Sequence, residues 1–402
     1  MARIRNIEDV FLEVLGQNRN KGTIKKKIRD FKKDDWEELV ELAIRNYLVA
    51  ALYRRLSLLQ LEEIPTNILY RLKTLFLLNL KRNTILEKEA LRLISSCFKK
   101  GNIAAVPLKG PLLGRYLYDD LAVRQVASDL DFLVPREKLK EATEALERNG
   151  CLPSFDKNNT SVLKFYLTYY RQLVFKKEIK KGLSLKIELH FDLGDEFTYA
   201  PLDDFWPSLT EVTLGTNNVW MPSKENLLIY LSLQAISINE FIELRYLYDI
   251  HSLASKFKNE LNWGEIASKI RDDRYKGFMF FALTLSQKCF HTEIPSDFLR
   301  KIKPDIFKIF FLKTLINRKN ILCKRNDSSY SWYYFFTLWH YFATSYLYSR
   351  DVIDCLRISY RKIFLPLDML AVCYSKPQIK VTYFFYLKRL LKPLTNLLYK
   401  NI

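Results

Sequence analysis

The chain has 402 residues, of which 49% are hydrophobic and 14% aromatic, so it is long enough for two or three packed domains and too apolar to be disordered. Its six cysteines show no paired CxxC spacing and its four histidines form no local metal motif, which argues against a disulfide scaffold and a zinc ribbon. The formal net charge of +19 favours an anionic partner, with a solvated charge excess as the alternative.

Residues 1–100 are expected to form an N-terminal helical region. Apolar side chains recur at helical spacing from Trp36 to Leu56 and again from Ile68 to Phe98. Pro65 separates the two helices, because proline interrupts a helix. The first 30 residues carry scattered charges and no apolar core typical of a secretory signal, so we expect the protein in the cytoplasm.

Residues 101–221 change from helical to strand-like periodicity. The apolar run Ile103–Leu108 ends at Lys109–Gly110 and predicts a buried strand followed by a turn. A second apolar run, Leu130–Val134, is followed by a proline and then by a helical segment that stops at Asn149–Gly150. This order of a strand and then a helix is typical of an α/β core.

Two further strands are predicted in the same region. Leu163–Lys176 and Leu183–Phe191 are rich in strand-forming residues and are joined by a turn at Lys180–Lys181–Gly182. In the second strand every other side chain is apolar, and the polar positions between them are Lys186, Glu188 and His190. One face of this strand therefore carries the polar chemistry.

Residues 222–402 return to helical periodicity and are expected to form a C-terminal helical region, in which Arg245 and Asp249 are predicted to make a surface ion pair at i,i+4 spacing. Residues 301–402 contain 18 Lys+Arg and 5 Asp+Glu, so they hold 13 of the 19 excess positive charges. We expect this basic end to contact a polyanionic acceptor or an anionic membrane surface. The uncharged, aromatic-rich segment 328–349 is predicted to be a buried helix, with an interfacial or a membrane-spanning helix as alternatives.

The densest chemistry lies at the start of the second strand. Asp129 and Asp131 are separated by one apolar residue, so their side chains project from the same face of the strand. Two such carboxylates can share one hard cation, and Glu188 on the later strand is a candidate third ligand. An Asp-x-Asp pair also occurs by chance at solvated strand ends, and it is the preceding glycine turn and the following helix that favour a catalytic role.

Candidate phosphate-binding residues precede the two aspartates. Lys109 can contact phosphate oxygens as a point charge, and Arg124 can contact them through its planar guanidinium. Gly110 marks a turn where a phosphate can approach the backbone, and Ser128 offers a hydroxyl beside the aspartates. Pairing of either cation with an aspartate is the structural alternative.

These segments together resemble a known family. Leu108–Gly110, Tyr116, Arg124, the sequence SDLDFLV at 128–134 and the sequence IELHFDL at 187–193 are similar to the nucleotidyltransferase group of unknown acceptor within the DNA polymerase β-like superfamily, a bacterial family. The resemblance extends over residues 30–260. It implies a small mixed sheet and a glycine turn beside the triphosphate. It also implies Asp129 and Asp131 as catalytic metal ligands, with Glu188 as the third carboxylate.

The chain departs from the superfamily at the glycine turn. The superfamily usually places a pair of small residues nearer to the aspartates, whereas Gly110 lies 19 positions before Asp129. The turn that grips the triphosphate is therefore expected to differ, and Gly114 is a second candidate for part of it.

The sequence predicts an α+β protein in which a small mixed sheet forms a nucleotidyltransferase core flanked by N-terminal and C-terminal helical regions. We expect an enzyme that transfers a nucleoside monophosphate from an NTP, such as ATP, to an acceptor with release of pyrophosphate, using Mg²⁺ or alternatively Mn²⁺. RNA, a protein side chain, a peptide and a sugar phosphate all stay open as acceptors. The alternative function is a non-catalytic helical adaptor that binds nucleic acid or an anionic membrane through its basic C-terminal region.

Overall fold

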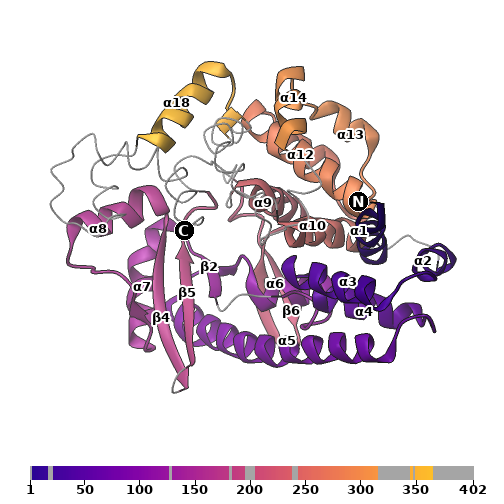
Figure 1. Cartoon of the computed structure of the whole chain (residues 1–402). Helices are drawn as coiled ribbons and strands as arrows, with labels where there is room; N and C mark the ends of the chain where they lie inside the picture. The colour runs from indigo at the N-terminus through magenta and orange to yellow at the C-terminus, as the bar shows by residue number, and fades with distance from the viewer. Residues whose placement is uncertain are drawn as a thin grey trace, which may run out of the picture.

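The computed structural model describes most of the chain, namely residues 2–16, 21–125, 129–180, 183–194, 204–237, 243–315, 345–346 and 349–364. Helices predominate among these residues, and they surround a five-stranded mixed sheet and a two-stranded hairpin (Figure 1). The predicted α+β fold with a small mixed sheet is confirmed. The predicted division at residues 100 and 221 stays a prediction, and one continuous apolar core includes side chains from all three regions.

Five helices form the beginning of the chain, namely α1 (Ala2–Leu15), α2 (Lys21–Ile28), α3 (Lys33–Arg45), α4 (Val49–Leu59) and α5 (Thr66–Leu93). The predicted helix Trp36–Leu56 is in fact two helices, because Tyr47 adopts a φ of 59°, and a left-handed residue ends an α-helix. Helix α5 begins directly after Pro65, as expected, and continues into η1 (Ile94–Phe98) and η2 (Lys99–Gly101). It runs across the lower part of the molecule in Figure 1, from the strands of the sheet to a position beneath α3 and α4.

The main sheet has the strand order β1-β2-β5-β4-β3. Its strands are β1 (Val106–Pro107), β2 (Asp129–Leu133), β3 (Leu152–Pro153), β4 (Gln172–Lys180) and β5 (Leu183–His190). Strands β2 and β5 are parallel, while the other neighbours are antiparallel. The central β2 and β5 are mostly apolar on one side because Leu130, Phe132, Ile187 and Leu189 are buried in the core. The opposite side of this strand pair is left for polar side chains.

The segment before β4 differs from the sequence-based expectation. Residues from Leu163 to Tyr170 were predicted as part of a strand, but they form the end of α8 (Thr160–Phe165) and the π-helix η4 (Tyr166–Tyr170). The reason is visible in the spacing, because Leu163, Tyr166 and Leu167 are three and four residues apart and pack together against the core. Aromatic and β-branched composition concealed this helical period.

The helices between and after the strands cover the sheet and form a second helical layer. They are α6 (Gly110–Tyr118), η3 (Arg136–Lys138), α7 (Leu139–Arg148), α9 (Lys224–Ser237), α10 (Leu244–Lys256), α11 (Trp263–Lys269), α12 (Asp273–Phe290), α13 (Ser296–Lys301), α14 (Ile306–Leu315) and α18 (Val352–Ile363). Helix α10 packs on α9, α12 and α6, and α1 packs on α12. A hairpin of β6 (Thr210–Leu214) and β7 (Asn217–Met221), which the sequence reading missed, turns at Gly215 with a φ of 66°.

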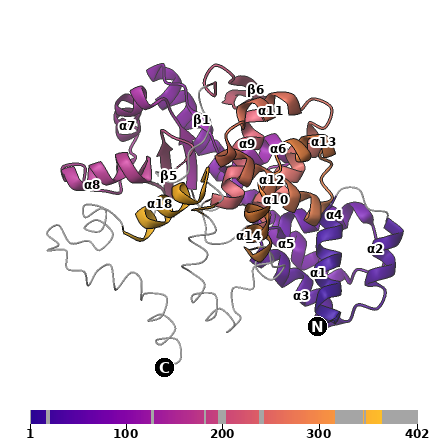
Figure 2. The same ribbon diagram turned by 90° about the horizontal axis from the view of Figure 1, so that it is seen from above.

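Seen from above, the sheet and α7 and α8 lie on one side of the molecule and the first helices on the other, with α9, α10 and α12 between them (Figure 2). Most of the aromatic segment 328–349 and all of the basic residues from 371 to 402 lie outside the described residues, so the expectations for them stay untested. Among the described residues, none of the helices combines the length and the apolarity needed to cross a bilayer.

Candidate active site

Two parallel strands bring the predicted carboxylates together. Asp131 of β2 is paired in register with Glu188 of β5, and both are buried, at 4% and 7% exposure. His190, two residues further along β5, projects from the same face because side chains alternate along a strand. Ligand atoms of these three residues all lie within 4.8 Å of one another, which is close enough to share one cation. Asp131, Glu188 and His190 are called the acidic cluster below.

Hydrogen bonds and ion pairs hold the acidic cluster in place. The Nε2 atom of His190 lies 3.2 Å from Oδ1 of Asp131 and 3.6 Å from Oε2 of Glu188. Lys109 donates a hydrogen bond to the same oxygen of Asp131 at 3.3 Å, and Lys186 donates to Glu188. Two lysines thus neutralise two carboxylates. A divalent cation can replace the lysines as the partner of the carboxylates, and a phosphate can replace the carboxylates as the partner of the lysines.

These contacts set the protonation of the cluster. Burial alone would raise the pKa of Asp131, but Lys109 and the hydrogen bond from His190 outweigh it and hold that pKa well below its usual range. Burial lowers the pKa of His190, yet hydrogen bonds to Asp131 and Glu188 raise it above its ordinary value overall. Asp131 is therefore a carboxylate at neutral pH, which is the form a metal ligand needs.

Asp129, the first predicted metal ligand, lies at the edge of the acidic cluster rather than within it. It is paired in register with Lys186 and is less buried than Asp131. Its pKa is raised by burial and by the negative charges of Asp131 and Glu188. Asp129 therefore feels the repulsion that a cation would relieve, and its side chain shares the face of β2 with Asp131.

The turn before α6 places backbone amides near the aspartates. Gly110 has a φ of 77° and lies against Asp129, since a Cβ on this glycine would be 3.8 Å from the Asp129 carbonyl oxygen. A left-handed residue at this position favours glycine, and Lys109 before it is the N-cap of α6. The predicted glycine turn is thus located beside the carboxylates, with a helix N-terminus that favours anions.

Arg124 lies in a different environment from the other predicted phosphate-binding residues. Its guanidinium is buried and donates to both carboxylate oxygens of Asp249 on α10, at 3.0 Å for the shortest contacts, and Tyr118 donates to the same carboxylate at 2.6 Å. Arg124 therefore follows the structural alternative that the sequence left open, in which the cation pairs with an aspartate. The predicted surface pair between Arg245 and Asp249 is wrong, because Asp249 is buried with Arg124 and Arg245 pairs with Glu243.

Gly114, the second candidate for the glycine turn, and Ser128, a candidate phosphate contact, have other outcomes. Gly114 is required for close packing, because a Cβ there would approach the Cβ of Arg124 to 3.0 Å, so this glycine lets α6 lie against the buried arginine. Ser128 lies outside the described residues, so its predicted contact with phosphate stays a prediction.

Sequence reasoning missed several residues around the site. Lys186 was seen only as a polar position on β5, and its pairing with Glu188 follows from their positions two residues apart on one strand face. Tyr230 on α9 is buried at 1% exposure. Burial raises the pKa of its phenol, the charge of Lys109 lowers that pKa and the charge of Asp131 raises it, so Tyr230 belongs to the surroundings of these two residues. No local signal identifies Tyr230, because Lys109 and Asp131, whose charges act on it, are far from it in the sequence.

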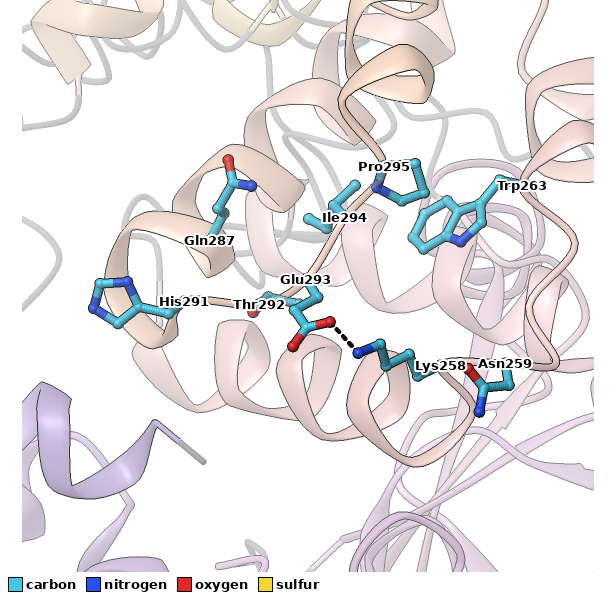
Figure 3. A pocket seen from close by; sticks show the side chains of 9 residues that line it. All are labelled: Lys258, Asn259, Trp263, Gln287, His291, Thr292, Glu293, Ile294 and Pro295. Atoms are coloured by element: carbon cyan, nitrogen blue, oxygen red, sulfur yellow. Dashed lines mark ion pairs between the residues drawn. The ribbon is translucent and has the colours of Figure 1, made fainter. Parts of the chain in front are cut away.

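A pocket of about 590 Å³ lies apart from the acidic cluster and is lined by residues of α11 and α12, of the turn after α10 and of the segment between α12 and α13 (Figure 3). Trp263 and Pro295 lie at one end of it, and Lys258 pairs with Glu293 across it (Figure 3). It shares none of its lining residues with the acidic cluster. The carboxylate side of β2 and β5 is therefore the better candidate for the active site.

Comparison with known proteins gives one match. A family model described as uncharacterised nucleotidyltransferase matches residues 32–291, which is more than half of the chain. The matched segment includes the acidic cluster, Asp129, Lys109 and Gly110. Neither the curated proteins nor the solved structures gave a match.

Proposed function

Because the chain belongs to the uncharacterised nucleotidyltransferase family, we propose that it transfers a nucleoside monophosphate from an NTP to an acceptor and releases pyrophosphate. The observation that carries this proposal is the in-register pairing of Asp131 with Glu188, beside Asp129 and the turn at Gly110. In the reaction, an acceptor oxygen attacks the α-phosphorus, the bond from that phosphorus to the bridging oxygen breaks, and the acceptor proton passes to a neighbouring carboxylate.

The donor atoms fit a divalent cation. Asp131, Glu188 and His190 offer ligand atoms within 4.8 Å of one another, and Asp129 adds a carboxylate on the same strand face. We propose that the three carboxylates hold Mg²⁺, with Mn²⁺ as the alternative, and that His190 orients Asp131 through a hydrogen bond and Glu188 through a contact of 3.6 Å. Such an ion, when bound, neutralises negative charge on the triphosphate.

The remaining residues bind and position the nucleotide. Lys109 already lies 3.3 Å from Asp131, so a phosphate oxygen that approaches the aspartate comes within reach of the same ammonium group. The N-terminus of α6 at Gly110 offers backbone amides to a further phosphate oxygen. Positioning and electrostatic stabilisation by these groups account for most of the expected rate enhancement.

The proposal is tested by incubating the purified protein with each α-labelled NTP, Mg²⁺ and a cell lysate, and by measuring pyrophosphate release and the label on RNA, protein, peptide and sugar phosphate fractions. We expect pyrophosphate release and one labelled fraction, both lost in Asp131→Asn. Absence of label and of pyrophosphate with all four NTPs, in Mg²⁺ and in Mn²⁺, contradicts nucleotidyl transfer. That result would favour the alternative function, a non-catalytic adaptor. The adaptor is not favoured now, because an adaptor has no need of buried carboxylates.

We also propose that the protein acts in the cytoplasm at an anionic membrane surface, and that the acceptor is met there. The specific observation is helix α18, whose apolar residues Val352, Ile353, Leu356 and Tyr360 are 53% to 71% exposed. Arg357 and Arg361, which are four residues apart and therefore share one side of the helix, are exposed next to these apolar residues. An outward apolar stripe beside cations is typical of helices that bind in the plane of an acidic membrane.

A further inference from the structure

Four aromatic rings gather at the junction of α8 and η4. The ring of Phe165 lies 5.8 Å from that of Tyr170 at an interplanar angle of 22°, so the two are stacked. Tyr166 meets both rings edge to face, at 5.4 Å from Phe165 and 5.7 Å from Tyr170, and Tyr169 lies 6.4 Å from Phe165. We call Phe165, Tyr166, Tyr169 and Tyr170 the aromatic cluster.

The chain path places the aromatic cluster beside the acidic cluster. Tyr170 precedes Gln172 by two residues, and Gln172 is paired in register with His190 on β5. Arg171, the residue after Tyr170, accepts a hydrogen bond at 3.4 Å from the backbone N–H of Phe191, the residue after His190. Burial lowers the pKa of Lys186, but Glu188 and, less strongly, Tyr170 raise it above its ordinary value. The pKa of Tyr166 is raised overall, because burial and Tyr170 raise it more than the positive charge of Lys186 lowers it. Lys186 thus acts on a second ring of the aromatic cluster.

The backbone holds the aromatic cluster in a defined orientation. Residues Tyr166–Tyr170 form a π-helical turn, and single π-helical turns are rare and frequently found at functional sites. The turn ends at Arg171, whose φ of 52° redirects the chain into β4. Arg171 is anchored by an ion pair with Asp192 at 2.7 Å, just beyond the end of β5. The rings are thus fixed relative to the strand that carries Glu188 and His190.

The exposure of Tyr170 suits a planar ligand. Its side chain is 46% exposed although one face of the ring stacks on Phe165, so the ring has surface left for a further stacked group. Lys186 pairs with Glu188, one of the proposed metal ligands. Among the parts of an NTP only the base is a π-system, and bases stack on aromatic side chains with little dependence on their identity.

We propose that Tyr170, supported by Phe165 and Tyr166, is the platform on which the base of the incoming NTP stacks, while the acidic cluster and Lys109 hold the triphosphate. This inference rests on the proposed nucleotidyl transfer and names the part of the chain that recognises the nucleoside. Stacking of this kind supplies affinity for the base and leaves the choice among the four bases to other contacts.

The test separates binding of the base from binding of the phosphates. Calorimetry with Ca²⁺ in place of Mg²⁺ measures the affinity of the wild type, Tyr170→Ala and Tyr170→Phe for each of the four NTPs and for inorganic tripolyphosphate, which has no base. For the NTP that binds most tightly, we expect Tyr170→Ala to weaken binding by roughly 5- to 100-fold and Tyr170→Phe to retain it. Tripolyphosphate affinity should be the same in all three proteins.

A matched control is Tyr70→Ala, which removes a tyrosine of 72% exposure on α5, and melting temperatures exclude unfolding as the cause of lost binding. The inference is overturned if Tyr170→Ala binds the NTP as the wild type does, or if it loses NTP and tripolyphosphate affinity equally. In either case the wild type still binds nucleotide and the proposed function stands. If the folded wild type binds neither ligand, the proposed function fails, and the base platform fails with it.

Discussion

The two aspartates of one short motif experience opposite electrostatic environments. Asp131 is stabilised as an anion by Lys109 and His190, and its pKa is held low. Asp129 is buried near two other negative charges, and its pKa is raised. A group with a raised carboxyl pKa costs stability at neutral pH when it is ionised, whereas a group with a lowered pKa contributes stability there. The two residues can therefore be separated experimentally even though the proposed reaction needs both.

We expect Asp129→Asn and Asp131→Asn each to reduce nucleotidyl transfer by roughly 100-fold or more, because each removes a carboxylate from a site that must neutralise a triphosphate. Their effects on stability should differ. Asp129→Asn relieves repulsion and leaves the melting temperature unchanged or higher, while Asp131→Asn deprives Lys109 and His190 of their partner and lowers the melting temperature.

Pyrophosphate release and calorimetric melting measure the two effects. Glu141→Gln, an exposed change on α7, is the control. Near wild-type turnover in either aspartate variant at saturating Mg²⁺ would remove that residue from the proposed metal site.

Glu188→Gln tests the third carboxylate. Turnover should fall strongly, while NTP affinity measured with Ca²⁺ should weaken only modestly, because Asp129 and Asp131 still hold the cation of the nucleotide. Lys186 loses its charged partner in this variant but stays exposed enough to be solvated. A variant with the wild-type rate would assign Glu188 to the structure of β5 alone.

A second buried histidine predicts a pH dependence of stability. His251 on α10 is 1% exposed, shares a hydrogen bond with Thr292 at 3.0 Å, and has its pKa lowered to about 4 by burial and by the charge of Arg55. Since the unfolded chain binds a proton near pH 6.5 and the folded chain only near pH 4, folded stability falls as the pH decreases through this interval.

We expect the difference in unfolding free energy between the wild type and His251→Gln to shrink by about 2 kcal/mol from pH 7.5 to pH 4.5, because the neutral amide does not titrate. Urea denaturation at the two pH values gives this difference, and groups common to both proteins cancel. A difference that is constant over this interval would show that His251 is readily protonated in the folded protein.

At the scale of whole elements, a buried ion pair joins the nucleotidyltransferase core to the second helical layer. Arg124 lies between α6 and β2, Asp249 lies on α10, and their side chains are 6% and 2% exposed. Asn79 and Asn83 of α5 donate to the carbonyl oxygen of Arg124, so this one residue connects three helices. An ion pair this deeply buried is costly to break, because the remaining charge is left without a partner.

We therefore expect Asp249→Ala to lower the free energy of unfolding by about 3 to 5 kcal/mol. The double variant Arg124→Met with Asp249→Leu should recover much of this loss, since no unpaired charge stays buried. Urea denaturation of the single and double variants measures both effects, and Glu141→Ala in the exposed pair with Lys138 should change stability by less than about 1 kcal/mol. Equal losses in the double and single variants would indicate that packing around Arg124, rather than its charge, dominates.

Local periodicity explains which elements were predictable. The alternation of apolar and polar residues in β2 and β5 identified the face that carries Asp131 and Glu188, because a strand has a side-chain period of two. The parallel pairing of these strands joins residues 57 positions apart, and the pairing of Arg124 with Asp249 joins residues 125 apart. Such contacts depend on packing between distant segments. The helix-ending conformation of Tyr47 did not follow from composition either, and the aromatic composition of Leu163–Tyr170 concealed a helical spacing that the sequence does contain.

At the scale of the whole molecule, apolar surface and positive charge coincide near its C-terminal part. Helix α18 buries the small polar side of the helix at Cys355 and Ser359 and turns its apolar stripe outward. On α14, Ile306, Phe307 and Phe310 are 61% to 75% exposed while Lys308 is buried and donates to the carbonyl oxygen of Ser349. Both helices lie along the upper side of the molecule in Figure 1. This arrangement inverts the usual amphipathic pattern of a surface helix and supports the proposal of an anionic membrane surface as partner.

The proposal predicts how the full chain binds vesicles. We expect co-sedimentation with phosphatidylglycerol vesicles and little with phosphatidylcholine vesicles, and the bound fraction should fall as salt rises because lipid charge is screened. Ile353→Glu with Leu356→Glu should abolish binding by placing charge in the apolar stripe, whereas Leu58→Glu, at a leucine of α4 that is 67% exposed, should not. Arg357→Gln with Arg361→Gln should weaken binding at low salt and flatten the salt dependence, since each arginine near an anionic surface contributes about 1 kcal/mol. Equal binding of the wild type and the Ile353→Glu, Leu356→Glu protein would show that α18 is not the contact, and binding that persists in phosphatidylcholine would show that the lipid charge does not matter.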